Sequence, residues 1–69
     1  MRKIRYSREA DILTLKLSEK PIDHAEEVEE IIVHFSADNE PVLIEILDAK
    51  GFISAVVSSL LEGKEISTL

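Results

Sequence analysis

With 69 residues, no cysteine and 45% hydrophobic residues, the chain has room for one small-cored domain. This composition excludes a disordered chain, disulfides and cysteine-ligated zinc, and it leaves oligomerisation as the means of stabilising so small a core. The net charge of −6 argues against broad binding to nucleic acid, because most of the surface would repel a polyanion.

The charge is unevenly distributed along the chain. Residues 1–20 carry six basic and three acidic side chains, whereas residues 21–48 carry nine acidic ones and neither Lys nor Arg. Binding to nucleic acid would therefore be confined to the first hairpin, and we expect none. No apolar run follows the basic start, and the longest apolar stretches have three residues, so neither a signal peptide nor a membrane span is predicted. We expect a cytoplasmic protein.

Period-two alternation predicts the first two strands, at about 2–6 and 12–17, with a turn between them. In that turn, the side chains of Ser7 and Asp11 are suited to accept hydrogen bonds from nearby backbone N–H groups. The acidic segment at 23–29 fits either an exposed helical turn or a charged edge strand. We expect the strand, because charge on a sheet edge discourages aggregation.

The clearest pattern is a hairpin of two strands at 30–35 and 41–47. A tight turn with Asp38 and Asn39 at its centre places six apolar side chains on one face, in three pairs: Phe35 with Val42, Val33 with Ile44 and Ile31 with Ile46. A slip by one residue would scatter these six over both faces, so the pattern selects this register. On the opposite face His34 faces Leu43, and half of the residues there are apolar.

A helix is predicted at about 49–62, with Asp48 as its N-cap and Gly63 as its C-terminal stop. Its apolar stripe spans about half the circumference. This stripe is wide enough to cover the six-residue face of the hairpin and to leave apolar surface over. The predicted fold is an α+β domain over residues 1–69, an antiparallel β-meander of four to five strands packed on one C-terminal amphipathic helix.

Two clusters of polar residues are candidates for a site. His24 and His34, with Glu26 or Glu45, are metal ligands by type, but they lack the i, i+2 or i, i+4 spacing of a specific motif, and the simpler interpretation is two solvent-facing histidines. The glutamates at 26, 27, 29 and 30 favour a solvated edge or a basic partner protein over calcium, because the segment has no Gly for a sharp calcium loop. No catalytic residue and no cofactor are predicted.

Two parts of the sequence together resemble a known family. Tyr6 and the turn ending in Glu-Ala-Asp11, followed by an alternating strand, are similar to the start of domain of unknown function 2283, and Ile44-Glu-Ile-Leu-Asp-Ala49 is similar to a later segment of it. The family comprises short bacterial and archaeal proteins without an established activity. The resemblance implies the same fold and a strand for the acidic segment. A genomic setting like that of small toxin–antitoxin pairs implies a binding role for some members.

This sequence departs from the family pattern at three positions. Asp38-Asn39 stands where members carry Asp-Gly, and His34 and Leu43 stand where an Asp and a Gly are expected. Any shared function that relies on that Asp is therefore not carried over to this chain.

The leading functional hypothesis is a small non-catalytic interaction module that forms a homo-oligomer, most simply a dimer. Its predicted partner interface consists of Ile32, His34, Leu43, Leu47, Leu61 and Ile66. The first alternative is an antitoxin-like or regulatory subunit that binds a small basic protein. The second alternative is metal or small-ligand binding around His24, His34 and Glu45.

Overall fold

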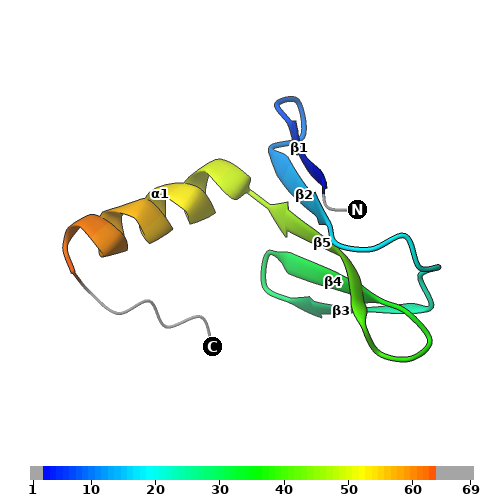
Figure 1. The fold of residues 1–69 in the computed structure, drawn as a ribbon. Helices are drawn as coiled ribbons and strands as arrows, with labels where there is room; N and C mark the ends of the chain where they lie inside the picture. Colours follow the sequence, from blue (N-terminus) through cyan, green and yellow to red (C-terminus); the bar gives the residue numbers. More distant parts are fainter. Residues whose placement is uncertain (1–2, 64–69) are drawn as a thin grey trace.

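The computed structural model describes residues 3–63 and shows five strands followed by one helix (Figure 1). These elements are β1 (Lys3–Ser7), β2 (Ile12–Lys16), β3 (His24–Val28), β4 (Ile31–Phe35), β5 (Pro41–Leu47) and α1 (Ala49–Leu61). All strand pairs are antiparallel, which confirms the predicted α+β class. Within the described residues, no helix combines the length and apolarity needed to cross a bilayer.

The strand order is β1-β2-β5-β4-β3, which differs from a simple sequential meander. Strands β3, β4 and β5 form a meander, and the β1–β2 hairpin joins it through a pairing of β2 with β5. The longest strand, β5, thus lies at the centre, while the acidic β3 lies at an edge where its glutamates stay solvated. The link between β2 and β3 crosses the end of the sheet, with the Leu17 N–H bonded to the Val42 carbonyl at 2.8 Å.

The β4–β5 hairpin has most of the predicted register. Val33 faces Ile44, Ile31 faces Ile46 and His34 faces Leu43, as expected. Phe35, however, pairs with Pro41 instead of Val42, because the register shifts between His34 and Phe35. The turn explains the shift: the Asn39 N–H bonds to the Ser36 carbonyl at 2.9 Å, so Ala37 and Asp38 occupy its centre. Asn39 follows in the left-handed conformation, at a φ of 63°, in a three-residue loop instead of the predicted two-residue turn.

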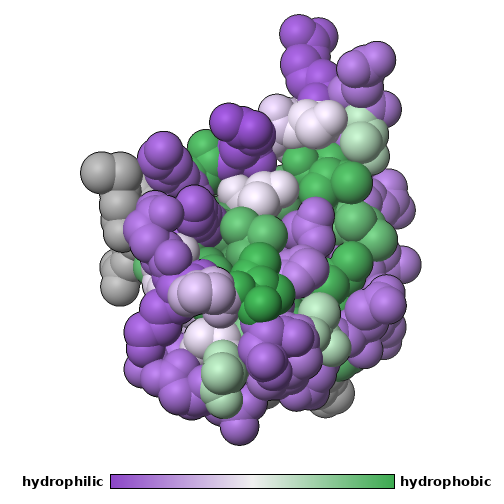
Figure 2. Space-filling model, turned by 90° about the vertical axis from the view of Figure 1, so that its right-hand side faces the viewer, coloured by the Kyte–Doolittle hydropathy of each residue, from purple (hydrophilic) through white to green (hydrophobic). Residues whose placement is uncertain are grey.

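The register divides the side chains between two faces of the sheet. Face A, as we name it, is almost entirely apolar and includes Ile4, Tyr6, Leu13, Leu15, Val28, Ile31, Val33, Phe35, Ile44 and Ile46, with His24 and Glu26 on the edge strand β3. Face B is mixed and consists of Lys3, Arg5, Ile12, Thr14, Lys16, Ala25, Glu27, Ile32, His34, Leu43, Glu45 and Leu47. Seen from the side away from the helix, the molecule shows a band of hydrophobic side chains bordered by hydrophilic ones (Figure 2).

The helix was predicted to cover the apolar face of the hairpin, but in the structure it does not. It leaves the end of β5 through Asp48 alone, at a φ of 53°, and extends away from the strands (Figure 1). Ala49 is its only buried residue, and exposure reaches 82% at Leu61. A one-residue link in the left-handed conformation directs the helix outward, so its stripe cannot fold back over the whole face. Gly63, at a φ of 70°, follows the helix end as predicted.

The buried core of residues 3–63 is correspondingly small. Its buried hydrophobic residues are Val42, Ile46 and Ala49. The large hydrophobic side chains that remain exposed are Ile4, Tyr6, Ile22, Val28, Ile53, Val57, Leu60 and Leu61. Two of the three buried side chains come from β5, which is the central strand and has two further strands on each side.

Candidate functional site

The first turn of α1 is held by Asp11, in the turn between β1 and β2. The Asp11 carbonyl accepts the Ala49 N–H at 3.0 Å, and the Asp11 Oδ1 accepts the Lys50 N–H at 3.1 Å. The Tyr6 hydroxyl donates to the same carboxylate oxygen at 2.6 Å. Asp48, the predicted N-cap residue, makes no side-chain cap bond. The cap is therefore supplied from a distant part of the chain, and it satisfies backbone donors that a helix terminus leaves free.

These contacts shift the ionisation of both side chains. The hydrogen bond from Tyr6 holds the pKa of the Asp11 carboxyl below its ordinary value, because it stabilises the charged form. The bond to Asp11 raises the pKa of the Tyr6 phenol, because ionisation would remove the donor and place two negative charges together. The pair thus consists of a carboxylate and a neutral phenol at neutral pH, which is an arrangement suited to a structural tether.

A hollow of about 470 Å³ lies where face A meets the start of α1. It is lined by Tyr6, Leu13, Ala49, Lys50, Ile53 and Ser54. Tyr6 and Leu13 belong to face A, and the other four belong to the first two turns of the helix. The helix therefore stands on the face A side of the sheet, and a largely apolar gap remains between the two.

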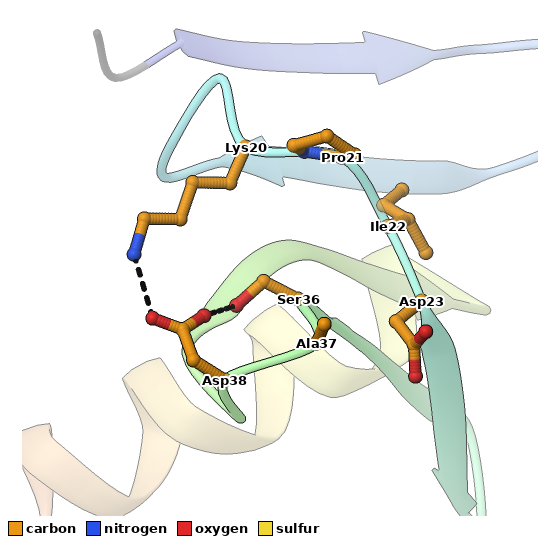
Figure 3. A pocket seen from close by; sticks show the side chains of 7 residues that line it. All are labelled: Lys20, Pro21, Ile22, Asp23, Ser36, Ala37 and Asp38. Carbon is orange, nitrogen blue, oxygen red and sulfur yellow. Dashed lines mark hydrogen bonds and ion pairs between the residues drawn. The ribbon is translucent and has the colours of Figure 1, made fainter.

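A second hollow, of about 360 Å³, lies between the β2–β3 link and the β4–β5 turn (Figure 3). It is lined by Lys20, Pro21, Ile22, Asp23, Ser36, Ala37 and Asp38. Lys20 reaches across to the turn, and its Nζ lies 2.9 Å from the Asp38 Oδ2 and 2.9 Å from the Glu40 Oε1. The Ser36 hydroxyl donates to Asp38 and accepts the Glu40 N–H at 3.1 Å. The polar groups of this hollow thus bind one another.

The pKa shifts in the cluster of Lys20, Ser36, Asp38 and Glu40 favour fixed charges over proton transfer. The carboxylates of Glu40 and Asp38 raise the pKa of the Lys20 ammonium, so it stays protonated and cannot serve as a base at neutral pH. The Ser36 hydroxyl and then Lys20 lower the pKa of Asp38. Ser36 is buried, and its hydroxyl is committed to the turn. The cluster therefore connects the β2–β3 link to the β4–β5 turn.

The two histidines do not converge on a metal site. His34 and Glu45 do meet on face B, with His34 Nε2 2.7 Å from the Glu45 Oε1. His24 lies on face A, where its ring stacks on Phe35 with centroids 5.3 Å apart. Among residues 3–63, no three His, Cys, Asp or Glu side chains form a group that could hold a metal ion. The alternative site around His24, His34 and Glu45 is therefore not assembled, because the β3–β4 register places the two histidines on opposite faces.

The predicted partner interface is only partly assembled. Ile32, His34, Leu43 and Leu47 share face B and are half-buried. Leu61 is exposed near the end of α1, and Ile66 lies outside the described residues. The most exposed hydrophobic strand residues, Ile4 at 76% and Val28 at 47%, lie on face A instead. Sequence reasoning missed them because it assigned that face to the helix.

The two edges of the sheet carry opposite charges. The edge strand β3 and the turn that follows it hold exposed glutamates at positions 26, 27, 29 and 30. Lys3 and Arg5 project from the other edge strand, β1, and Arg8 lies in the turn that follows β1. The uneven distribution of charge along the sequence thus becomes a polarity across the sheet, because β1 and β3 lie at its two ends.

Of the residues that hold the helix start, Asp11 was predicted from the sequence to have a structural role, in the turn between the first two strands. Asp11 was expected to bond locally, as Ser7 does when its hydroxyl accepts the Ala10 N–H at 3.3 Å. The side chain of Asp11 instead reaches the helix, which the spacing of 39 residues between Asp11 and Lys50 does not reveal. The sequence thus indicated a turn residue at Asp11, and the structure shows that Tyr6 and Asp11 together hold the start of the helix.

Comparison of the chain with curated proteins and with solved structures found no match. A family model does match, over residues 3–50, and its description is protein of unknown function (DUF2283). The matched segment contains the whole sheet and the tether between Tyr6, Asp11 and the helix start. Because this segment covers most of the sequence, the chain belongs to the DUF2283 family.

Proposed function

We propose that the protein is a small non-catalytic interaction module that works as a homodimer. The observation that carries this proposal is the apolar surface that one copy leaves open. Only Val42, Ile46 and Ala49 are buried hydrophobic residues in the described chain, whereas eight large hydrophobic side chains are exposed. Contiguous exposed apolar surface on a small protein marks an interaction site.

The arrangement of the elements explains why a second surface is needed. A sheet with one apolar face must bury that face against another layer to be stable. Here the only helix of residues 3–63 extends away from the sheet, and the buried core is small even for a short chain. A second copy supplies the missing layer, and a two-fold pair does so with a single self-complementary interface.

The non-catalytic part of the proposal rests on the polar clusters. The Lys20 ammonium is paired with the carboxylates of Asp38 and Glu40, and the Ser36 hydroxyl is bonded within the turn. The Tyr6–Asp11 pair is likewise used in binding the helix. Each of these groups already has a structural task and a partner, which is the state expected of a scaffold.

Sedimentation velocity of the untagged chain over a micromolar concentration range tests the homodimer. The expected result is a species of twice the 7.8 kDa chain mass that dissociates on dilution. A single species of chain mass at every concentration, with the circular dichroism of a folded protein, would refute the proposal.

A second candidate function is capture of a small basic protein by the acidic edge. The specific observation is that β3 is an edge strand, so its outer backbone groups are open beside four exposed glutamates. An extended basic segment can add to such an edge by backbone hydrogen bonds and ion pairs. This function corresponds to the antitoxin-like or regulatory subunit that the sequence suggests as an alternative.

Charge reversal in the turn tests this second candidate. We expect the double variant Glu29→Lys and Glu30→Lys to lose basic proteins that the unmodified chain captures from a lysate of its host. The matched control is Glu9→Lys with Glu62→Lys, which makes the same charge change far from β3. Equal capture by both double variants would count against an acidic-edge binding site.

A further inference from the structure

We propose that face B is a second self-association surface, on which another copy of the chain lies with its basic half over the acidic half. The proposed homodimer buries the apolar face A, on the other side of the sheet, so this inference goes beyond it. With both faces in use, homodimers join through face B into longer assemblies, because contacts on opposite sides of one sheet do not close on each other.

The charged side chains of face B are sorted by sign across the sheet. Lys3 and Arg5 lie on β1 and Lys16 lies on β2, and these two strands carry no acidic side chain. Glu45 lies on the central strand β5 and Glu27 on the edge strand β3, and β5, β4 and β3 carry neither Lys nor Arg. Face B therefore has a basic half and an acidic half.

Much of this charge has no partner within one copy. Neither Arg5 nor Glu27 forms an ion pair with another residue of the described chain, and both are exposed. They lie on the two opposite edge strands, and four strand spacings place them about 19 Å apart. Lys16 pairs at 3.1 Å with Glu19, whose side chain is itself 61% exposed. Counter-charges for Arg5 and Glu27 must therefore come from another molecule.

A second copy supplies these charges in matching places. The register aligns Arg5, Glu45 and Glu27 in one row across the sheet, and it aligns Lys16 and His34 in the next row. A two-fold axis parallel to the strands and over β5 keeps each row in place and exchanges the two edges. Arg5 of each copy then lies over Glu27 of the other, and Lys16 lies over His34, beside the Glu45 that His34 binds at 2.7 Å. Opposite charges meet at both rims, which favours this partner and this orientation.

The middle of face B is mostly apolar and is open to a partner. Ile12, Ile32, Leu43 and Leu47 lie between the charged edges and are half-buried in one copy. The helix stands on the face A side of the sheet, so it leaves face B free. An apolar centre with a polar rim is typical of a protein interface. Because face B has fewer apolar side chains than face A, we expect its contact to be weaker than the homodimer.

A charge swap tests the contact by sedimentation equilibrium of the untagged chain from micromolar to millimolar concentration. Arg5→Glu and Glu27→Arg each place like charges at both rims, whereas the double variant restores opposite charges and the net charge of the unmodified chain. Glu9→Arg is the control, because it makes the same charge change as Glu27→Arg in the turn outside β1 and β2. All three positions are exposed, so each variant is expected to keep the circular dichroism of the unmodified chain.

We expect the unmodified chain to form species larger than the homodimer as its concentration rises. Each single variant is expected to raise the Kd of this further association by about tenfold, and the double variant to return it to within about threefold of the unmodified value. Absence of any species beyond the homodimer, or single variants that equal Glu9→Arg, would overturn the face B contact. A double variant as weak as the single ones would overturn its orientation.

The same data separate this contact from the proposed homodimer. If the largest species is a dimer that the single variants dissociate and the double variant restores, face B is itself the dimer interface. That result would support the face B contact and refute the burial of face A by a second copy. A chain that stays monomeric at every concentration would overturn both proposals.

Discussion

The Tyr6 hydroxyl lies 2.6 Å from the Oδ1 of Asp11, and through this pair the first hairpin holds the start of the helix. The same oxygen accepts the Lys50 N–H, so one carboxylate joins β1, the first turn and α1. Two segments within the DUF2283 match, the one around Tyr6 to Asp11 and the one ending at Ala49, therefore meet in space.

The first prediction concerns this tether. Tyr6→Phe removes the donor to Asp11 and leaves the aromatic ring, so we expect Tm to fall by a few degrees with little loss of strand signal. Asp11→Ala also removes the acceptor for the Lys50 N–H, and we expect a larger fall in Tm together with a loss of helix signal in far-UV circular dichroism. Asp48→Asn is the control, because Asp48 makes no cap bond and Asn tolerates its left-handed backbone. A fall in Tm for Asp48→Asn as large as for Asp11→Ala would contradict this assignment.

The second prediction is a pH dependence. Because the folded pKa of Asp11 lies below its unfolded value of about 3.9, its contribution to stability is present above about pH 4 and is lost as pH falls through the folded pKa. Asp38 and Glu19 act with the same sign. We expect Tm to fall on acidification, and to fall less steeply in Asp11→Asn, whose side chain does not ionise. Parallel acid profiles for Asp11→Asn and the unmodified chain would show that Asp11 is not coupled to folding.

On the alkaline side we expect Tm to fall as pH rises, whereas on the acid side it falls as pH decreases. The folded pKa of Tyr6 is raised, so its contribution is present below about pH 10 and is lost as pH rises through the folded value. Tyr6→Phe removes this titration. Spectrophotometric titration of the single tyrosine, followed by its absorbance as a phenolate, measures the shift directly.

The third prediction concerns Gly51, which lies inside the first turns of the helix. The nearest atom to a methyl group added there is the Asp48 Oδ2 at 3.9 Å, which is an ordinary contact distance. We expect Gly51→Ala to stabilise the protein by up to about 1 kcal/mol, because Ala has the higher helix propensity. Urea denaturation measures this change, and destabilisation would mean that the helix start is packed more tightly than the structure shows.

The fourth prediction tests the turn of the central hairpin. Asn39 has a φ of 63°, a conformation that Gly adopts without strain and that costs a residue with a Cβ about 1–2 kcal/mol. We expect Asn39→Ala to destabilise by about 1 kcal/mol and Asn39→Gly to be close to neutral. Ala37→Gly serves as the comparison, because Ala37 is not among the residues with positive φ. Equal stability of Asn39→Ala and Asn39→Gly would indicate that the turn relaxes to another type.

The fifth prediction concerns the core. Ile46, in the central strand β5, is 7% exposed, so we expect Ile46→Ala to cost about 2–5 kcal/mol of unfolding free energy. That is a large part of the stability of so short a chain. Ile22→Ala in the β2–β3 link, where Ile22 is 50% exposed, is expected to change stability by about 0.5 kcal/mol or less. Chemical denaturation of both variants at one protein concentration provides the test.

Local sequence patterns predict some features of the fold and of the candidate site but not others. Period-two alternation was enough to find the strands other than the acidic β3, because the apolar side of each strand must face a common layer. The pairing of Val33 with Ile44 followed from the same rule. The sequence left open whether His24 and His34 share a face, because this depends on the β3–β4 register, and the acidic β3 has too few apolar residues to reveal that register.

By itself the sequence determined the strands other than β3, the helix with its stop at Gly63 and the left-handed residue at Asn39, because each depends on periodicity or on the conformational freedom of one residue. Only the tertiary structure decided that β5 is central, that Asp11 caps the helix in place of Asp48, and that the helix leaves face A open. These features depend on contacts between segments far apart in the chain. These contacts form only when the β1–β2 hairpin packs beside β5, so a local sequence pattern cannot predict them.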